Sequence, residues 1–231
     1  MTQTQQAVAW TLDLGAAAEA LRLLKQANHV LIPTHQNVDA DGLASPIALS
    51  LALREFGVVA QPMLSDGELP PSLEFLPYRD KVLAYGNDPL PEYDMLLLVD
   101  CSDRKRLGGF YADDPTRLDR NTIPIVNIDH HVTNDLFGTV NIVVPQAAAT
   151  AEIVTELLKA WGVTLTTPIA QCLLAGIYGD TLGLRTSSTT SRTMRTAADL
   201  VDAGAETSPI VDALFRIKPR STVCLWEKAL Q

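Results

Sequence analysis

Acidic and histidine side chains gather where apolar runs of the sequence end. His35 closes one run and is followed by two aspartates within six residues. Further aspartates and histidines follow two other apolar runs and an apolar stretch with a helical pattern. The chain has only four histidines, and three of them lie beside acids at such positions, so their placement is informative. The full set is His35, Asp39, Asp41, Asp100, Asp129, His130, His131 and Asp180.

These residue types favour metal chemistry. Carboxylates and imidazoles without thiolates suit a hard or borderline divalent ion such as Mn, Mg, Fe or Co. The set is too large for one ion and suits two ions that share a bridging carboxylate. Two ions about 3.5–4 Å apart can hold a hydroxide between them and clamp phosphoryl oxygens during in-line displacement. Taken singly, each residue has an ordinary explanation, because an aspartate at a strand end is commonly a turn or helix-cap residue.

The elements that must position this set follow from the apolar pattern. Runs without alternation are typical of parallel strands buried on both faces, and we expect strands over residues 29–34, 58–64, 81–84, 93–99 and 123–128. We expect helices over residues 14–27, 42–56, 148–161, 169–178, 191–203 and 209–217. This alternation predicts a three-layer α/β/α fold with a mostly parallel, Rossmann-like sheet. Ligands bind outside the carboxyl ends of such strands, so distant residues can converge there.

Composition excludes several classes of protein. With 231 residues, 47% hydrophobic and 19% charged, the chain can bury a core and is not disordered. No apolar run approaches the roughly 18 residues of a membrane span, and no secretory signal is visible. Three cysteines without a CxxC fit a reducing cytoplasm. A net charge of −9 without a long basic stripe argues against long duplex DNA as a partner, whereas bound cations would still allow small phosphates.

Four motifs in order resemble those of the DHH phosphoesterases, whose triplet is present as Asp129-His130-His131. The first motif, HxxxDxD, spans residues 35–41, the second is the strand-end Asp100, and the fourth is Gly176-Ile177-Tyr178-Gly179-Asp180-Thr181. The chain looks most like the RecJ-like oligoribonuclease and pAp-phosphatase type. The resemblance implies hydrolysis of phosphodiester or phosphomonoester bonds in short oligonucleotides, cyclic dinucleotides or 3′,5′-bisphosphate nucleotides.

The resemblance also implies roles for individual residues. One ion, most readily Mn with Mg or Co as substitutes, would be held by His35, Asp39 and Asp100. The other would be held by Asp41, Asp100, His130 and Asp180, with Asp100 as the bridge. His131 would lie beside the phosphate as a catalytic group, and Asp129 would orient the histidines. Arg185, Ser187 and Ser188 could contact phosphate, although a solvated loop explains them equally well.

Domain organisation is expected to follow the same family. Residues 1–217 would form the phosphoesterase domain, and residues 218–231, with a helix over 222–230, would begin an interdomain linker. The family's C-terminal substrate-binding domain would then be absent, and this chain alone is expected to be weakly active. A homodimer is left open. The alternatives are an inorganic pyrophosphatase or exopolyphosphatase, and a non-catalytic regulatory module with the same fold.

Overall fold

The computed structural model describes residues 10–217 and 227–228, so most of the helix expected over 222–230 lies outside the described residues. Its centre is a six-stranded sheet in the order β3-β2-β1-β4-β5-β6, in which every pairing is parallel. The predicted α/β class and parallel sheet are therefore confirmed. The strands are β1 (His29–Pro33), β2 (Val59–Leu64), β3 (Leu83–Ala84), β4 (Met95–Val99), β5 (Ile125–Asp129) and β6 (Val140–Val143).

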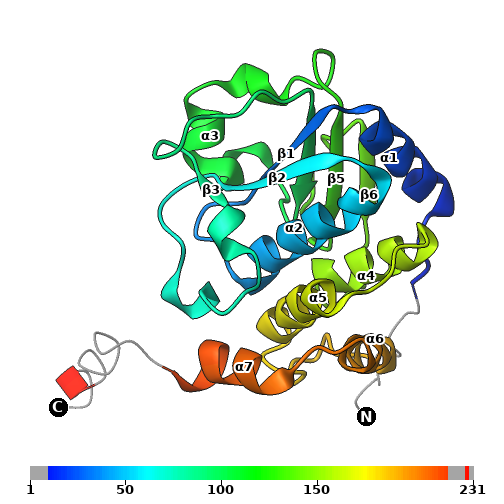
Figure 1. The fold of residues 1–231 in the computed structure, drawn as a ribbon, viewed down its shortest axis with the longest axis vertical. Coiled ribbons are helices and arrows are strands. Elements are labelled where there is room, and N and C mark those ends of the chain that lie inside the picture. Colours follow the sequence, from blue (N-terminus) through cyan, green and yellow to red (C-terminus); the bar gives the residue numbers. More distant parts are fainter. Residues whose placement is uncertain (1–9, 218–226, 229–231) are drawn as a thin grey trace, which may run out of the picture.

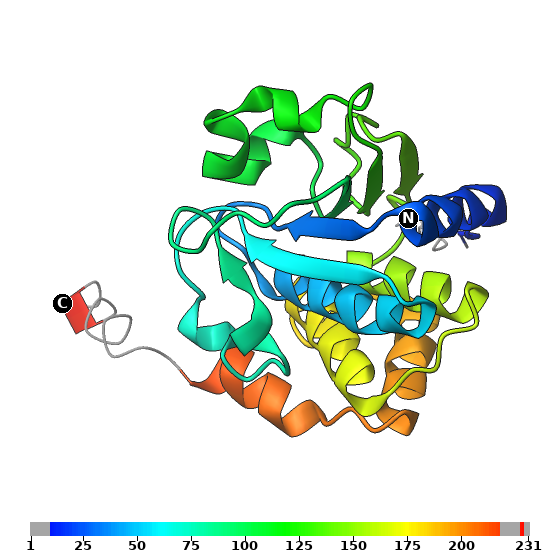
Figure 2. The ribbon, with the colours of Figure 1, turned by 45° about the horizontal axis from the view of Figure 1, so that its top comes forward.

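Helices cover both faces of this sheet unequally (Figures 1 and 2). One face carries α1 (Leu14–Gln26), α2 (Ala40–Leu53) and α4 (Thr150–Ala160). Against these pack α5 (Thr167–Asp180), then α6 (Ser191–Asp202) and α7 (Thr207–Val211). The opposite face carries the short α3 (Gly108–Ala112) and nearby 3₁₀ turns. The arrangement is a three-layer fold with one thick and one thin helical layer.

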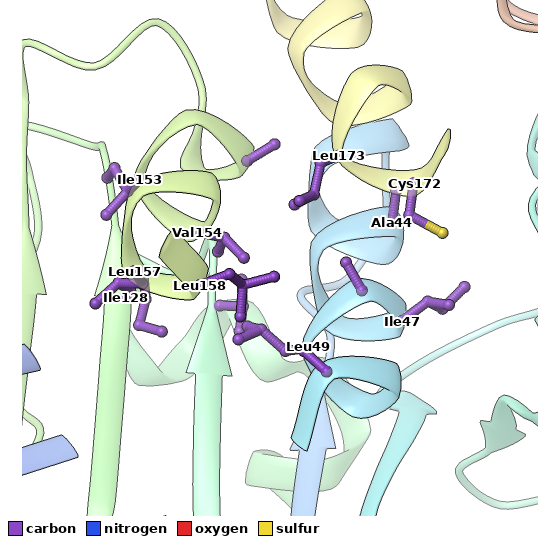
Figure 3. Close-up of a cluster of buried hydrophobic side chains, with 14 of the residues drawn as sticks. Ala44, Ile47, Leu49, Ile128, Ile153, Val154, Leu157, Leu158, Cys172 and Leu173 are labelled. Carbon is purple, nitrogen blue, oxygen red and sulfur yellow. The ribbon is translucent and has the colours of Figure 1, made fainter. Parts of the chain in front are cut away.

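The thick layer is held together by α2 and α5, two helices that carry apolar residues on nearly every face. In α2 almost every residue is buried, which is the pattern of a helix enclosed by neighbours on all sides. Helix α2 packs along α5, and its Ala44 and Ile47 belong to the same buried cluster as Cys172 and Leu173 of α5 (Figure 3). On the sheet side, α4 packs Leu157 against Ile128 of β5. Tight packing of this kind fixes the start of α2, the start of α4 and the end of α5 relative to the strand ends.

Three elements differ from the sequence-based expectation, and the first is the short helix α3, which was not predicted. The structure has a sixth strand, β6, that was not predicted, because it is a short edge strand in which buried Val140 and Ile142 alternate with half-buried residues. The helix expected over residues 209–217 is instead α7 followed by a single π-helical stretch, Asp212–Arg216. None of the helices in the described part of the chain has both the length and the apolar character that a membrane span requires.

The strand order creates a crevice at one position along the sheet edge. The chain runs from β1 outward to β2 and β3, then returns to place β4 on the other side of β1. In open α/β sheets, ligands bind beside the carboxyl ends of strands at this reversal. The reversal therefore places the ends of β1 and β4, with β5 next to them, around one crevice.

Candidate metal centre

Six of the predicted ligands meet in this crevice. Their oxygen and nitrogen atoms form two separate groups, within each of which the atoms lie within 4.8 Å of one another. The first group is His35, Asp39 and Asp100, and the second is Asp41, His130 and Asp180. Asp100 also groups with His130 and His131 by the same criterion. The structure thus brings together residues that are up to 145 positions apart in the sequence.

Asp100 stands between the two groups, and its two oxygens face different sides. Oδ2 lies 3.4 Å from Nε2 of His35, whereas Oδ1 lies 3.6 Å from Nε2 of His130. The residue directly follows β4 and has a left-handed backbone with φ 59°. Aspartate tolerates this region better than most residues, although it still costs conformational energy. The geometry is that of a carboxylate able to serve two ions at once.

The two inner histidines are oriented by main-chain carbonyls. Nδ1 of His35 lies 2.8 Å from the Gln36 carbonyl oxygen, and Nδ1 of His130 lies 3.3 Å from that of Ala147. A carbonyl only accepts, so each Nδ1 donates and each Nε2 is directed to the carboxylates. Nε2 of His35 is buried without a hydrogen-bond partner. A buried polar atom of this kind needs an explanation, and a bound cation between the imidazole and the carboxylates supplies it.

Two glycines make room for these side chains. A Cβ on Gly42, in the first turn of α2, would overlap the His35 imidazole. A Cβ on Gly176 of α5 would lie 2.6 Å from Oδ1 of Asp41. The chain therefore needs the absence of a side chain at both positions, and at Gly176 this absence lets α5 approach the start of α2 closely.

Asp41 is held by the beginning of α4. Its Oδ2 accepts from the backbone N–H of Thr150 at 2.6 Å, and its Oδ1 accepts from that of Ala151 at 2.9 Å and from Ser45 Oγ at 2.8 Å. Unpaired N–H groups at a helix N-terminus stabilise a negative charge. Thr150 and Ala151 could not be assigned to the site from the sequence, because their partner Asp41 lies more than 100 positions away and leaves no local signal.

Asp129 and His131 form a separate pair at the edge of the cluster. Oδ1 of Asp129 accepts from Nδ1 of His131 at 2.7 Å, and Oδ2 accepts from Nδ2 of Asn134 at 2.6 Å. Burial alone would raise the pKa of Asp129, but these hydrogen bonds hold it below its usual range. His131 therefore has Nε2 as the ring atom left for a ligand. Asn134 is a further residue that the sequence analysis did not identify.

The acids of the cluster favour protonation of the groups around them. Burial acts to lower the pKa of His35, but the Asp100 and Asp39 carboxylates and the Gln36 carbonyl raise it to about 10. The pKa of His130 is also raised, since Asp180, Asp41 and Asp100 outweigh its burial. Burial and the nearby charges of Asp180 and Asp100 raise the pKa of Asp41 well above its usual range. Protons thus occupy the place that cations would take.

We expect Mn²⁺ binding at pH 7 to release protons. The raised pKa of His35, about 10, means that its imidazole is protonated at pH 7, and a metal ligand must be neutral. As pH rises from about 7 towards about 10, this competition fades, so Mn²⁺ affinity should increase. Calorimetric titrations in buffers of different ionisation enthalpy measure the protons released. An Mn²⁺ affinity that stays constant or falls over this pH range would contradict the expectation.

The side chains of the three residues suggested for phosphate contact make no bond to the cluster within the described residues. The Arg185 guanidinium stacks on the Phe215 ring, with 5.4 Å between Cζ and the ring centroid. Ser188 Oγ pairs with Thr186 Oγ1 at 2.7 Å, and Ser187 is exposed. In the described part of the chain, no hydrogen bond or ion pair joins any of the three to the side chains of the two groups described above. Their contact with substrate stays a prediction.

Comparison with known proteins agrees with this geometry. A family model described as the N-terminal domain of the DHH family matches residues 29–177. The chain is 32% identical over 200 residues to the bifunctional oligoribonuclease and PAP phosphatase NrnA of Thermus thermophilus, covering 85% of this chain and 56% of that protein. It is 30% identical to a probable manganese-dependent inorganic pyrophosphatase of Bacillus licheniformis, covering 74% and 54%. The chain thus spans about half the length of these two relatives.

Solved structures confirm the fold. The crystal structure of an exopolyphosphatase-related protein from Bacteroides fragilis superposes with a TM-score of 0.83 at 19% identity, covering 96% of this chain and 66% of that one. The family match includes the ends of β1, β4 and β5 and five of the six predicted ligands, whereas Asp180 lies three residues beyond it. The chain belongs to the DHH family.

Proposed function

We propose that this chain is a phosphohydrolase that depends on two divalent ions, preferentially Mn, with Mg or Co as substitutes. The observation that carries the proposal is the pair of separate ligand groups with Asp100 between them, one oxygen towards each. His35, Asp39 and Asp100 would hold one ion, and Asp41, Asp100, His130 and Asp180 the other. Two such ions activate water as a nucleophile and neutralise charge on phosphoryl oxygens.

The side chains around the two ions would orient the phosphoryl group and supply the proton for the leaving oxygen. Asp129 fixes the His131 ring through Nδ1, so Nε2 is available to stabilise charge on the phosphoryl group or to protonate the leaving oxygen. The half-exposed His131 and the more exposed Asp39 lie on the solvent side of the cluster, whereas Asp100 and Asp41 are buried beneath. Substrate would therefore approach from the side of His131 and Asp39.

For the substrate we propose a small phosphorylated nucleotide: a short oligonucleotide, a cyclic dinucleotide or a 3′,5′-bisphosphate nucleotide. The names of the NrnA relatives support this class. Inorganic pyrophosphate or polyphosphate is the second candidate, supported by the relatives named as pyrophosphatases. A cytoplasmic location and a homodimer stay predictions.

A substrate panel tests the proposal. We expect Mn²⁺-dependent hydrolysis of bis-p-nitrophenyl phosphate at a low rate. Turnover of pAp and dinucleotides should be much weaker than that of a full-length NrnA relative, of which this chain spans about half, because substrate positioning can change a rate about a hundredfold. Pyrophosphate and polyphosphate are assayed beside them, and chelator-treated protein is the control. Preferential release of phosphate from pyrophosphate would favour the second candidate. Tight Mn²⁺ binding without hydrolysis of any substrate would favour a non-catalytic module.

A further inference from the structure

Thr150 contacts a carboxylate from each of the two ligand groups. It is fully buried at the first position of α4. Its Oγ1 donates to Oδ1 of Asp100 at 2.9 Å, and its backbone N–H donates to Oδ2 of Asp41 at 2.6 Å. No other residue of the described chain makes hydrogen bonds to carboxylates of both groups. The start of α4 is therefore bonded directly to the floor of the crevice.

Asp100 depends on this contact more than the other acids do. The Thr150 hydroxyl makes the one hydrogen bond that the Asp100 side chain accepts within the described residues. The histidine nitrogens around it are 3.4–3.6 Å away. Without the hydroxyl, nothing but these longer contacts would fix the rotation of the carboxylate about its Cβ–Cγ bond. That rotation decides which oxygen faces His35 and which faces His130.

We propose that Thr150 is a positioning residue that sets the Asp100 carboxylate so that each oxygen serves one ion. The inference rests on the metal site proposed above. Thr150 Oγ1 holds Oδ1 of Asp100, the oxygen nearer to His130. The Thr150 N–H holds Asp41, which would be a ligand of the same ion as His130. Loss of the hydroxyl therefore weakens the ion between Asp41, His130 and Asp180 first. The ion beside His35 and Asp39 keeps those two ligands unchanged.

A neighbouring threonine distinguishes this role from ordinary helix packing. Thr155 is also fully buried in α4, but its Oγ1 donates to the Ala151 carbonyl within the same helix at 2.7 Å. Thr155→Val removes a buried hydroxyl of the same kind without touching either ligand group. It is the matched control for Thr150→Val, which keeps nearly the same shape and loses only the donor.

The experiment measures Mn²⁺ binding by calorimetry, and the magnetic coupling of two bound Mn²⁺ ions by electron paramagnetic resonance. Thr150→Val should weaken the second Mn²⁺ by about 10–100-fold, as loss of a hydrogen bond to a metal ligand commonly does, while the first binds within a few-fold of wild type. With two equivalents of Mn²⁺ added, the electron paramagnetic resonance spectrum of Thr150→Val should shift from that of a coupled pair towards that of isolated Mn²⁺ ions. Thr150→Ser should restore both readouts, and Thr155→Val should leave both unchanged.

Failure of this inference is distinguishable from failure of the proposed function. If the wild-type chain binds two coupled Mn²⁺ ions and Thr150→Val does the same with equal affinity, the role of Thr150 is wrong and the metal site stands. If the wild-type chain does not bind two ions, the proposed function itself fails. Should Thr150→Val not fold, Thr150→Ala is compared with Thr150→Ser, which differs by one hydroxyl. Equal second-ion affinity in that pair would also overturn the role.

Discussion

Asp100→Ala is expected to abolish Mn²⁺-dependent hydrolysis and to weaken both ions together. Its oxygens lie 3.4 Å from Nε2 of His35 and 3.6 Å from Nε2 of His130, so a single truncation removes a ligand from each group. The loss of rate should exceed about a thousandfold, which is already the upper cost of removing one fixed electrostatic stabiliser from an active site. Calorimetry on the variant measures both affinities, and an assay with bis-p-nitrophenyl phosphate measures the rate.

Two companion variants make this result interpretable. Asn tolerates the left-handed backbone of residue 100 better than Ala, so Asp100→Asn separates loss of the ligand from backbone strain. Asp103→Ala is the control, because this nearby acid caps a 3₁₀ turn through the Lys105 N–H and belongs to neither ligand group. Loss of one ion with full retention of the other in Asp100→Ala would disprove the bridging role, whereas Asp100→Asn keeps a single side-chain oxygen and is expected to support at most one of the two ions.

His131→Ala is expected to slow hydrolysis by about 10²–10⁴-fold, the usual contribution of a positioned acid or base, while Mn²⁺ binding is spared. Nδ1 of His131 is committed to Asp129 at 2.7 Å, so the ring is fixed by a carboxylate outside both ligand groups. If His131 protonates the leaving oxygen, the loss should be smaller for a p-nitrophenyl ester than for an alkyl ester, because nitrophenolate leaves without help.

The structure also allows a different role for His131, as a metal ligand, which the same variant would reveal. Asp100, His130 and His131 form a third group of atoms within 4.8 Å, which would make His131 a metal ligand. In that case His131→Ala would lower Mn²⁺ affinity as much as it lowers the rate. His29→Ala is the control, since His29 is exposed at the opposite end of β1 and should change neither quantity.

The sequence predicted the strands that position the site better than it predicted the rest of the sheet. The strands β1, β4 and β5 are mostly apolar and, apart from the exposed His29, buried on both faces, and polar residues mark where each strand ends. The edge strand β6 carries a weaker signal, because only Val140 and Ile142 are buried within its four residues. Burial on both faces therefore explains why the central strands could be recognised from the pattern alone.

The convergence of the ligands could be predicted, but the hydrogen bonds that support them could not. Parallel strands end on one edge, so residues after β1, β4 and β5 must meet there. Thr150 and Asn134 are different, because a threonine at a helix start or an asparagine in a loop has many ordinary roles. Thr150 acquires its partners Asp41 and Asp100 only when α4 packs against the strand ends.

A crystal of this chain soaked in Mn²⁺, with diffraction recorded at the Mn absorption edge, tests the two-ion site most directly. We expect two anomalous peaks about 3.5–4 Å apart. One should lie among His35, Asp39 and Asp100, and the other among Asp41, His130 and Asp180, with an oxygen of Asp100 beside each. A single peak, or peaks outside this crevice, would contradict a two-ion centre bridged by Asp100.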